Sequence, residues 1–308
     1  MPETCLLFNA AAGSAAAAEP LVREFLQRND VEFHATSGPG DIPKFTHSAV
    51  ERGLRRLIVA GGDGTITKVI TSLAPDFGQV ELAIVPLGTG NDFARSLSID
   101  AADIASALEN ATFGAARPVD LVRITDEAGT GYLINAASGG VAGKVAAEVD
   151  SDDKQVLGPF AYWLAAVNEL TDLQEYRVSL DLDDEHVQLD VYGMYFANGR
   201  YVGGGFTVAP DALLDDGLLD ITTIPAMPPV ELLAAGMSFA LGWDDGRARL
   251  RTFRTRRVHF LAEPDMHFSV DGEPTRAIEA SLEVLPGAAR IVPGPAAEAF
   301  SSDASNRS

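Results

Sequence analysis

The sequence predicts two domains of different class, an α/β domain followed by an antiparallel β-sandwich. Up to about Arg117, short apolar runs alternate with amphipathic segments of helical periodicity, which indicates parallel strands joined by crossover helices. From Pro118 onward, apolar residues alternate with polar ones at period two, as in strands with one buried face. The chain has 308 residues, more than most single hydrophobic cores contain. We therefore expect domains over 1–117 and 118–290.

Each expected element follows from its local pattern. In the first domain we expect strands over 5–9, 31–35, 57–60 and 82–85, and helices over 15–27, 42–53 and after Thr65. In the second we expect strands over 119–124, 132–136, 177–182, 187–196, 218–224, 257–261 and 266–270. Turns are expected at Asp183-Asp184 and Asp271-Gly272, helical insertions over 158–171 and 229–241, and a disordered tail over 301–308.

Two glycine-rich stretches each close an apolar run and open a helical segment. They are Gly61-Gly62-Asp63-Gly64-Thr65 and Pro86-Leu87-Gly88-Thr89-Gly90-Asn91-Asp92. Glycines let a backbone approach a ligand closely, and the amides at a helix start favour an anion. Ligands of parallel α/β sheets bind at the carboxyl ends of the strands, where both stretches lie. The pattern predicts a nucleotide site.

Composition limits the partners. The net charge of −21 argues against nucleic acid, because phosphate binding needs Lys and Arg along the contact, and it opposes binding to anionic membranes. The acidity and the scarcity of lysine fit a salt-adapted host, and a GC-rich genome would explain the lysine scarcity equally well. The single cysteine, Cys5, excludes an internal disulfide. With no signal peptide or long apolar run, we expect a cytoplasmic protein, at most peripheral at the inner membrane face.

An ordered set of motifs resembles the diacylglycerol kinase catalytic-domain family, the bacterial and archaeal lipid kinases related to sphingosine kinases. The resemblance runs nearly end to end. It rests on both glycine-rich stretches with Phe93-Ala94-Arg95, then Val119-Asp120-Leu121, Lys154 with Leu157-Gly158 and Tyr162, Ala197-Asn198-Gly199, Gly203-Gly204-Gly205, Asp216-Gly217-Leu218-Leu219-Asp220 and Asp271-Gly272-Glu273-Pro274. Gly-Gly-Asp-Gly-Thr alone would be weak, since NAD kinases and phosphofructokinases carry close relatives of it. The order of the whole set makes it specific.

The resemblance implies a Rossmann-like first domain related to NAD kinases and phosphofructokinases, with ATP bound between it and the β-sandwich. A C-terminal segment near 291–300 would return to the first domain. This chain lacks a Gly-Lys-Ser/Thr loop, so backbone amides would hold the phosphates.

For the nucleotide, the matched positions are Gly61, Gly62, Asp63, Gly64, Thr65, Ile66 and Thr67, together with Asn9, Gly13, Thr36 and Thr89. Thr36 is equally explained as a turn residue, and Asp63 would also cap the helix that begins near Thr65. Asn91 and Asp92 admit the same capping role, and we treat Asp92 as mainly architectural. Lys154 or Arg95 would neutralise phosphate or lie on the surface.

For the metal, the resemblance implies Mg²⁺ held by Asp216 and the main-chain carbonyls of Leu213 and Leu218, with Asp120 in an adjoining water network. One carboxylate plus carbonyls suits a hard cation that keeps several waters. The alternative is a solvated acidic turn over Asp215, Asp216 and Asp220. Glu273 is the candidate general base, against the alternative of an exposed loop residue. We therefore assign catalysis to Glu273 and Asp216.

The match departs from the family at two places. The family's Asn-Pro-x-x-Gly is here Asn9-Ala10-Ala11-Ala12-Gly13, and the Asn and Glu that normally follow the first glycine loop are Thr67 and Lys68. A carboxylate has become a cation, which would grip phosphate or face solvent. His186, His259 and His267 lack ligand spacing and are interpreted as structural or surface residues.

The expected function is an ATP- and Mg²⁺-dependent lipid kinase that phosphorylates a hydroxyl of a diacylglycerol-like lipid at a membrane surface. The alternatives are an NAD kinase-type phosphotransferase and a non-catalytic nucleotide- or lipid-binding regulator. An exposed sheet edge would allow a homodimer.

Overall fold

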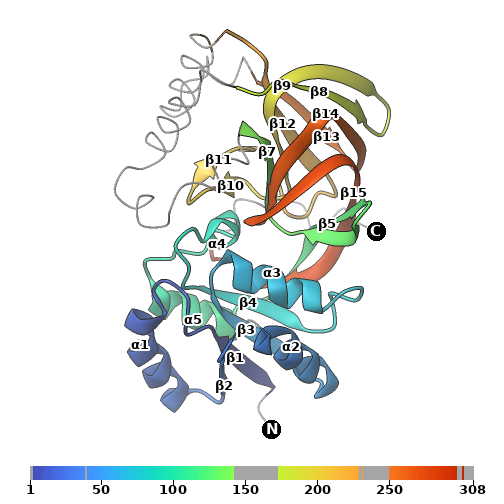
Figure 1. Ribbon diagram of the computed structural model, residues 1–308. Helices are drawn as coiled ribbons and strands as arrows, with labels where there is room; N and C mark the ends of the chain where they lie inside the picture. The colour runs from blue at the N-terminus through green and yellow to red at the C-terminus, as the bar shows by residue number, and fades with distance from the viewer. Residues whose placement is uncertain are drawn as a thin grey trace. The chain divides into compact units, whose positions relative to one another are not determined.

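The computed structural model describes residues 3–38, 40–141, 173–228, 231, 250–296 and 300–301, which form parts of two compact units (Figure 1). The first unit comprises Met1–Leu121, Leu213–Gly217 and Leu285–Ser308, and the second comprises Val122–Ala212 and Leu218–Val284. The expected helix over 158–171 and the tail over 302–308 lie outside the described residues, as does all but Glu231 of the helix expected over 229–241.

The first unit is built on parallel strands. In spatial order they are β2 (Glu32–Ala35), β1 (Thr4–Phe8), β3 (Arg56–Gly61), β4 (Glu81–Pro86) and the end of β15 (Glu273–Ile291). Each neighbouring pair runs parallel, and β15 joins β4 through Ile291 and Leu82. Antiparallel pairing predominates in the chain as a whole, because the second unit contributes more strands.

Helices cover the faces of this parallel sheet (Figure 1). They are α1 (Ala15–Arg28), α2 (Asp41–Glu51), α3 (Asp63–Ser72), the short α4 (Asp92–Ser96) and α5 (Ile104–Phe113). Ile58 and Ala60 of β3 share a core with Val22 of α1 and Leu108 of α5. Because side chains alternate along a strand, the intervening Leu57 and Val59 point to the opposite face. The central strands are therefore apolar on both faces, as their continuous apolar runs predict.

Cys5 lies in β1 and is fully buried. Burial raises the pKa of its thiol to about 12, with a smaller contribution from Glu32. The thiol is therefore protonated and shielded at neutral pH.

The second unit consists of antiparallel strands that curl around one core. They are β6 (Gly129–Leu133), β7 (Ala136–Gly140), β8 (Tyr176–Asp181), β9 (His186–Ala197), β10 (Tyr201–Val202), β11 (Phe206–Thr207), β12 (Leu219–Pro225), β13 (Arg251–Thr255), β14 (Arg257–Val270) and parts of β5 (Arg117–Asp126) and β15. Both β7 and β8 pair with β9 on one side and β14 on the other. The strands thereby enclose the core instead of spreading into an open sheet.

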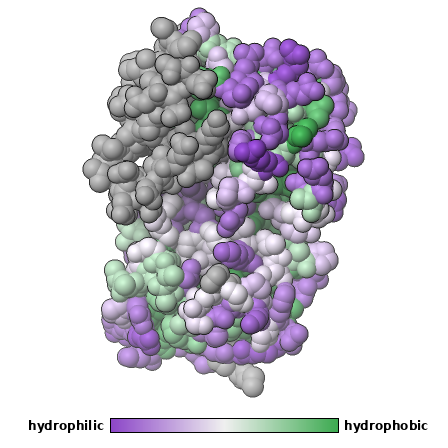
Figure 2. All heavy atoms as spheres, viewed as in Figure 1, coloured by the Kyte–Doolittle hydropathy of each residue, from purple (hydrophilic) through white to green (hydrophobic). Residues whose placement is uncertain are grey.

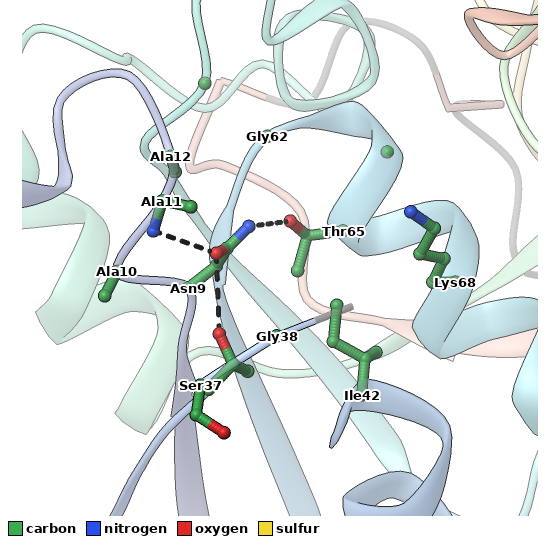
Figure 3. A pocket seen from close by; sticks show the side chains of 13 residues that line it. Asn9, Ala10, Ala11, Ala12, Ser37, Gly38, Ile42, Gly62, Thr65 and Lys68 are labelled. Carbon is green, nitrogen blue, oxygen red and sulfur yellow. Dashed lines mark hydrogen bonds between the residues drawn. The ribbon is translucent and has the colours of Figure 1, made fainter. Parts of the chain in front are cut away.

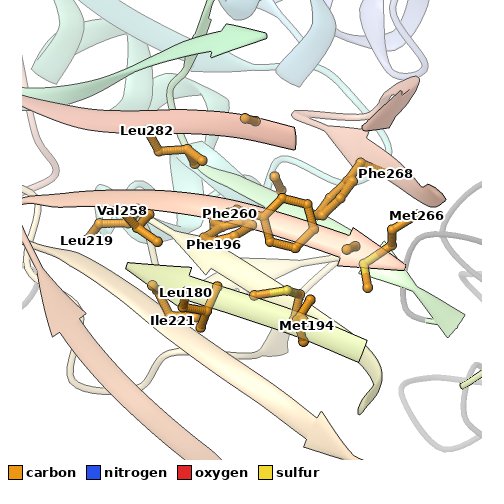
Figure 4. Packing of buried hydrophobic residues seen from close by; sticks show 14 of the residues in the cluster. Leu180, Met194, Phe196, Leu219, Ile221, Val258, Phe260, Met266, Phe268 and Leu282 are labelled. Carbon is orange, nitrogen blue, oxygen red and sulfur yellow. The ribbon is translucent and has the colours of Figure 1, made fainter. Parts of the chain in front are cut away.

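Aromatic side chains fill the centre of this core (Figure 4). The Phe260 ring meets Phe196 and Phe268 edge-on, at centroid distances of 5.7 Å and 5.4 Å. Such edge-to-face pairs contribute beyond the apolar area they bury. Exposed and buried residues alternate along β8, and hydrophilic side chains cover much of the visible described surface of this unit (Figure 2).

Some strands differ from the sequence expectation. The segments expected over 257–261 and 266–270 form one strand, β14, whose pairing with β15 shifts register between Leu261 and Met266. The strand expected over 132–136 is instead divided between the end of β6 and the start of β7. Sequence periodicity also did not predict β10, β11, β13 or β15. The exposed and charged first half of β15 hides the period-two pattern that would identify it.

The units also divide the chain differently from the expected boundaries at 117/118 and 290/291. The first unit extends to Leu121, takes in 213–217 from the middle of the chain, and resumes at Leu285. Because β5 and β15 each run through a unit boundary, strand periodicity gives no local signal for these divisions.

Candidate functional site

A pocket of about 540 Å³ lies in the first unit at the carboxyl ends of its parallel strands. Asn9 follows β1, Thr36 follows β2, Gly62 follows β3 and Gly88 lies just beyond β4. The pocket is lined by Asn9, Ala10, Ala11, Ala12, Thr36, Ser37, Gly38, Ile42, Gly62, Gly64, Thr65, Lys68 and Gly88. Its position is where ligands of parallel α/β sheets bind.

Asn9 ties three of these loops together (Figure 3). Its Nδ2 donates to Thr65 Oγ1 at 2.8 Å. Its Oδ1 accepts from the Ala11 amide at 3.1 Å and from Thr36 Oγ1 at 3.4 Å. One amide side chain therefore fixes the loops after β1 and β2 against α3, so the polar side of the pocket is preformed.

Three glycines of the motifs are required by close packing. A Cβ on Gly88 would lie 2.5 Å from the Gly62 Cα, and a Cβ on Gly62 would lie 2.9 Å from the Gly88 Cα. A Cβ on Gly61 would meet the Thr65 side chain at 2.7 Å. The two glycine-rich stretches thus touch backbone to backbone, which explains these glycines without any ligand.

Gly64 behaves differently. It lines the pocket, and a Cβ built on it would meet no atom within 4 Å. It stands in the first turn of α3, where alanine would be favoured over glycine by helix propensity. Packing within the described protein therefore does not explain Gly64, whereas close approach of a ligand to the backbone would.

Asp63 does not line the pocket. Its carboxylate accepts from the backbone amides of Asp92 at 3.1 Å and Phe93 at 3.0 Å, at the start of α4. The expected cap of Asp63 on its own helix is not formed, because Gly62 occupies the N-cap position before α3 and the Asp63 carboxylate binds the first amides of α4 instead. This long-range cap joins the two glycine-rich stretches and is an architectural role.

The other expected nucleotide residues lie around the pocket without lining it: Gly13, Gly61, Ile66, Thr67 and Thr89. Ile66 is buried in the core because its position on α3 faces the sheet. Gly13 faces Thr89, whose Oγ1 would lie 3.0 Å from a Cβ at Gly13. Sequence patterns did not point to Ser37, Gly38 and Ile42, which also line the pocket. Ser37 and Gly38 directly follow Thr36, and Ile42 lies in the first turn of α2.

Among the described residues that line the pocket, Lys68 is the one with an ionisable side chain. Lys68 and Ile42 lie across the pocket from Asn9 and Ala10 (Figure 3). The start of α3 contributes partial positive charge at Gly62. The described part of the lining has a cation, hydroxyls and a helix start and no carboxylate, which favours an anionic ligand such as a polyphosphate.

A second candidate region of the first unit is the loop over 213–217, which carries Asp216. Asp120 is fully buried and accepts from the Gly217 amide and the Gly287 amide, both at 2.6 Å. The Asp120 amide donates to the Leu214 carbonyl at 2.7 Å. Asp120 therefore holds the loop on either side of Asp216 through backbone groups.

The oxygen atoms expected to bind the metal could supply some of the ligands of a hard cation. Within the described ranges, no three His, Cys, Asp or Glu side chains come together as a metal cluster. Leu213 and Asp216 belong to the first unit, whereas Leu218 belongs to the second. One half-buried carboxylate and a neighbouring carbonyl would serve an ion such as Mg²⁺ that takes its remaining ligands from water and phosphate.

In the second unit, Asp271 and Gly272 form the turn between β14 and β15, as the sequence predicts. The Asp271 carboxylate accepts from three successive backbone amides, those of Ile134 at 2.7 Å, Asn135 at 2.9 Å and Ala136 at 3.1 Å. Glu273, the expected base, is exposed at the start of β15. This role of Asp271 was not expected from the sequence, because Asp-Gly is explained by the turn alone.

Comparisons with known proteins match both halves of the chain. A family model described as the diacylglycerol kinase catalytic domain matches residues 3–124, and one described as the YegS C-terminal NAD kinase β-sandwich-like domain matches residues 135–293. A "Probable lipid kinase YegS-like" of Klebsiella pneumoniae (strain 342) is 32% identical over 277 residues, which are 88% of this chain and 91% of that protein. A protein of the same description from Pseudomonas aeruginosa (strain UCBPP-PA14) is 34% identical over 256 residues, 82% of this chain and 81% of that protein.

Solved structures share the fold. A diacylglycerol kinase from Bacillus anthracis strain Sterne has a TM-score of 0.72 at 22% identity, covering 96% of this chain and 98% of that chain. Another crystal structure from the same organism has a TM-score of 0.78 at 25% identity, covering 96% of both chains.

No helix within the described residues combines the length and apolarity needed to cross a membrane.

Proposed function

Because the chain belongs to the family with a diacylglycerol kinase catalytic domain, whose relatives include YegS-like lipid kinases, we propose that it phosphorylates a lipid hydroxyl with ATP and Mg²⁺. The acceptor is a diacylglycerol-like lipid, met at a membrane surface. A kinase of this family uses ATP as phosphate donor. The identity of the acceptor lipid and the use of Mg²⁺ go beyond what membership of the family implies.

The observation that carries the proposal is the chemistry of the pocket. Loops after four parallel strands converge on a space lined by hydroxyls, backbone and one ammonium group. The open face of Gly64 leaves room for phosphate beside the start of α3, and Lys68 would neutralise part of its charge. We assign the ATP phosphates to this pocket.

Asp216 and the carbonyls of Leu213 and Leu218 would hold Mg²⁺, which would supply positive charge against the phosphates. Glu273 is the general base that takes the proton from the acceptor hydroxyl. The hydroxyl oxygen forms the new bond to the γ-phosphorus, the bond from that phosphorus to the bridging oxygen breaks, and ADP leaves. The exposure of Glu273 leaves its carboxylate accessible to a substrate.

The test is transfer of label from ATP into vesicles made from a mixed lipid extract with Mg²⁺, with NAD as a competing acceptor. We expect a labelled lipid, whose mass gives the acceptor. Glu273→Gln should lower turnover by at least about 100-fold while ATP binding is retained. Glu279→Gln is the matched control, an exposed glutamate of the same strand, and should leave turnover unchanged.

Each other outcome contradicts the proposal. Label in NADP instead of lipid would make the protein an NAD kinase. ATP binding without transfer to any acceptor would make it a binding regulator. Full turnover in Glu273→Gln would remove Glu273 from the mechanism.

A further inference from the structure

The C-terminal residues of the first unit clasp the loop that carries Asp216. The Ser301 amide donates to Asp215 Oδ1 at 2.7 Å, and Ser301 Oγ donates to Asp215 Oδ2 at 3.0 Å. Arg117 reaches Asp215 Oδ2 at 3.5 Å and the Ser301 carbonyl at 3.4 Å. The Arg117 guanidinium also lies 4.3 Å from the centre of the Phe300 ring. We call these four residues, Arg117, Asp215, Phe300 and Ser301, the C-terminal clasp.

The clasp is a buried and specific contact. Asp215 is 9% exposed and Phe300 is 6% exposed. A solvated acidic turn would leave its carboxylates in water, whereas Asp215 is held by donors from residues far away in the chain. The stacking of Arg117 on Phe300 adds a cation–π contact to the ion pair. Asp215 therefore binds Ser301 and is not a solvated surface carboxylate.

Asp216 stands between two anchored neighbours. On one side the Asp215 side chain is fixed by the clasp, and on the other the Gly217 amide is fixed by Asp120 at 2.6 Å. Loss of either anchor would restore conformational freedom to the backbone of the loop. A ligand group binds a cation more tightly when it is held in its binding conformation beforehand.

We propose that Ser301, acting through Asp215, is a positioning residue for Asp216 and the Leu213 carbonyl. The C-terminal clasp holds the 213–217 loop in the conformation that presents these oxygens to a divalent cation. The cation-binding part rests on the proposed function, whereas the control of the loop by the clasp is independent of it.

The first measurement is hydrogen exchange of the peptide that contains 213–217, which requires no activity. Two variants break the clasp: a chain that ends at residue 296, and Asp215→Asn, which keeps the shape of the side chain but loses one acceptor oxygen. Both should accelerate exchange at the Gly217 amide by about tenfold or more, because the loop opens more readily once the charge-assisted hydrogen bonds between Asp215 and Ser301 are lost. A chain that ends at residue 304 retains the clasp and is the control.

The second measurement is binding of Mn²⁺, used as a paramagnetic stand-in for Mg²⁺, to the full chain and to Asp215→Asn. We expect affinity to fall about tenfold in Asp215→Asn, and the Mg²⁺ concentration for half-maximal turnover to rise more than the maximal rate falls. If the shortened chain does not fold, Asp215→Asn still tests the proposal in the full-length chain.

Unchanged exchange of the 213–217 peptide in both clasp variants would overturn the proposal. Faster exchange with unchanged Mn²⁺ affinity would overturn the positioning of the cation ligands. Faster exchange and weaker Mn²⁺ binding in a chain that transfers no phosphate would support the clasp while refuting the kinase.

Discussion

The stretch Gly61–Thr65 and the turn Asp271–Glu273 use their aspartates alike and differ in what lies beside them. Asp63 accepts hydrogen bonds from two backbone amides at the start of α4, and Asp271 accepts them from three amides that lead into the start of β7. Next to Asp63, Gly64 and Thr65 line a pocket, whereas Glu273 beside Asp271 is exposed on a strand.

The difference separates two kinds of residue within a motif. A carboxylate whose oxygens already accept hydrogen bonds from backbone amides has a structural role, because charge-assisted hydrogen bonds to amides stabilise a loop. The neighbouring groups without such a structural task are the better candidates for chemistry. By this criterion Gly64, Lys68 and Glu273 are the residues to test for function, and Asp63 and Asp271 the residues to test for stability.

The largest expected effect is at the contact between the two glycine-rich stretches. Gly88→Ala would place a Cβ 2.5 Å from the Gly62 Cα, and backbone cannot move aside cheaply. We expect a loss of about 3 kcal/mol in the free energy of unfolding, measured with urea. Gly78→Ala is the control, since its Cβ would meet the nearest atom at an ordinary 3.7 Å. Equal stability of the two variants would show that the stretches are not in contact.

The loss of stability on replacing each aspartate should increase with the number of backbone amides that its carboxylate binds. Asp271→Asn should cost about 2 kcal/mol and Asp63→Asn about 1 kcal/mol, because Asn replaces one acceptor oxygen with a donor that faces an amide. Asp271 has a φ of 46°, which asparagine tolerates well, so the substitution tests the carboxylate and not the backbone. Urea unfolding of both variants checks the order; the reverse order would refute the comparison.

Asp183 is a third carboxylate that accepts a hydrogen bond from a backbone amide, and it predicts that stability depends on pH. Asp183 accepts from the Arg256 amide at 2.7 Å and from Thr255 Oγ1 at 3.0 Å, and the pKa of its carboxyl is lowered, first by the Arg256 hydrogen bond. A lowered folded-state pKa stabilises above the unfolded-state pKa, about 4, and the benefit disappears as pH falls through the folded value. Asp183→Asn should therefore cost about 1 kcal/mol at pH 7 and progressively less below pH 4. A cost independent of pH would contradict this origin.

The smallest change in stability is expected at Gly64. Gly64→Ala should raise the free energy of unfolding by about 0.5 to 1 kcal/mol, because alanine favours a helix and nothing is near its Cβ. The same substitution should weaken binding of a fluorescent ATP analogue, since the methyl group enters the pocket. A stabilised variant that binds the analogue as well as wild type would exclude phosphate from this face of α3.

Sequence periodicity was sufficient for much of the local structure. Apolar runs placed β1 and β3, and helical spacing placed α1 over Ala15–Arg28, near the expected 15–27. The glycine-rich stretches located the pocket, because the carboxyl ends of parallel strands share one edge of a sheet. The expected residues Asn9, Thr36, Gly62, Gly64 and Thr65 all line it.

By itself, the sequence determined the two domain classes, the family motifs and the position of the pocket, because these follow from local periodicity and from short spacings. The tertiary structure alone decided which aspartate binds which amide, why Gly62 and Gly88 must be bare, and that Ser301 holds Asp215. The last pair is 86 residues apart in the chain. Such contacts depend on how distant segments pack, and no local pattern of residue types encodes them.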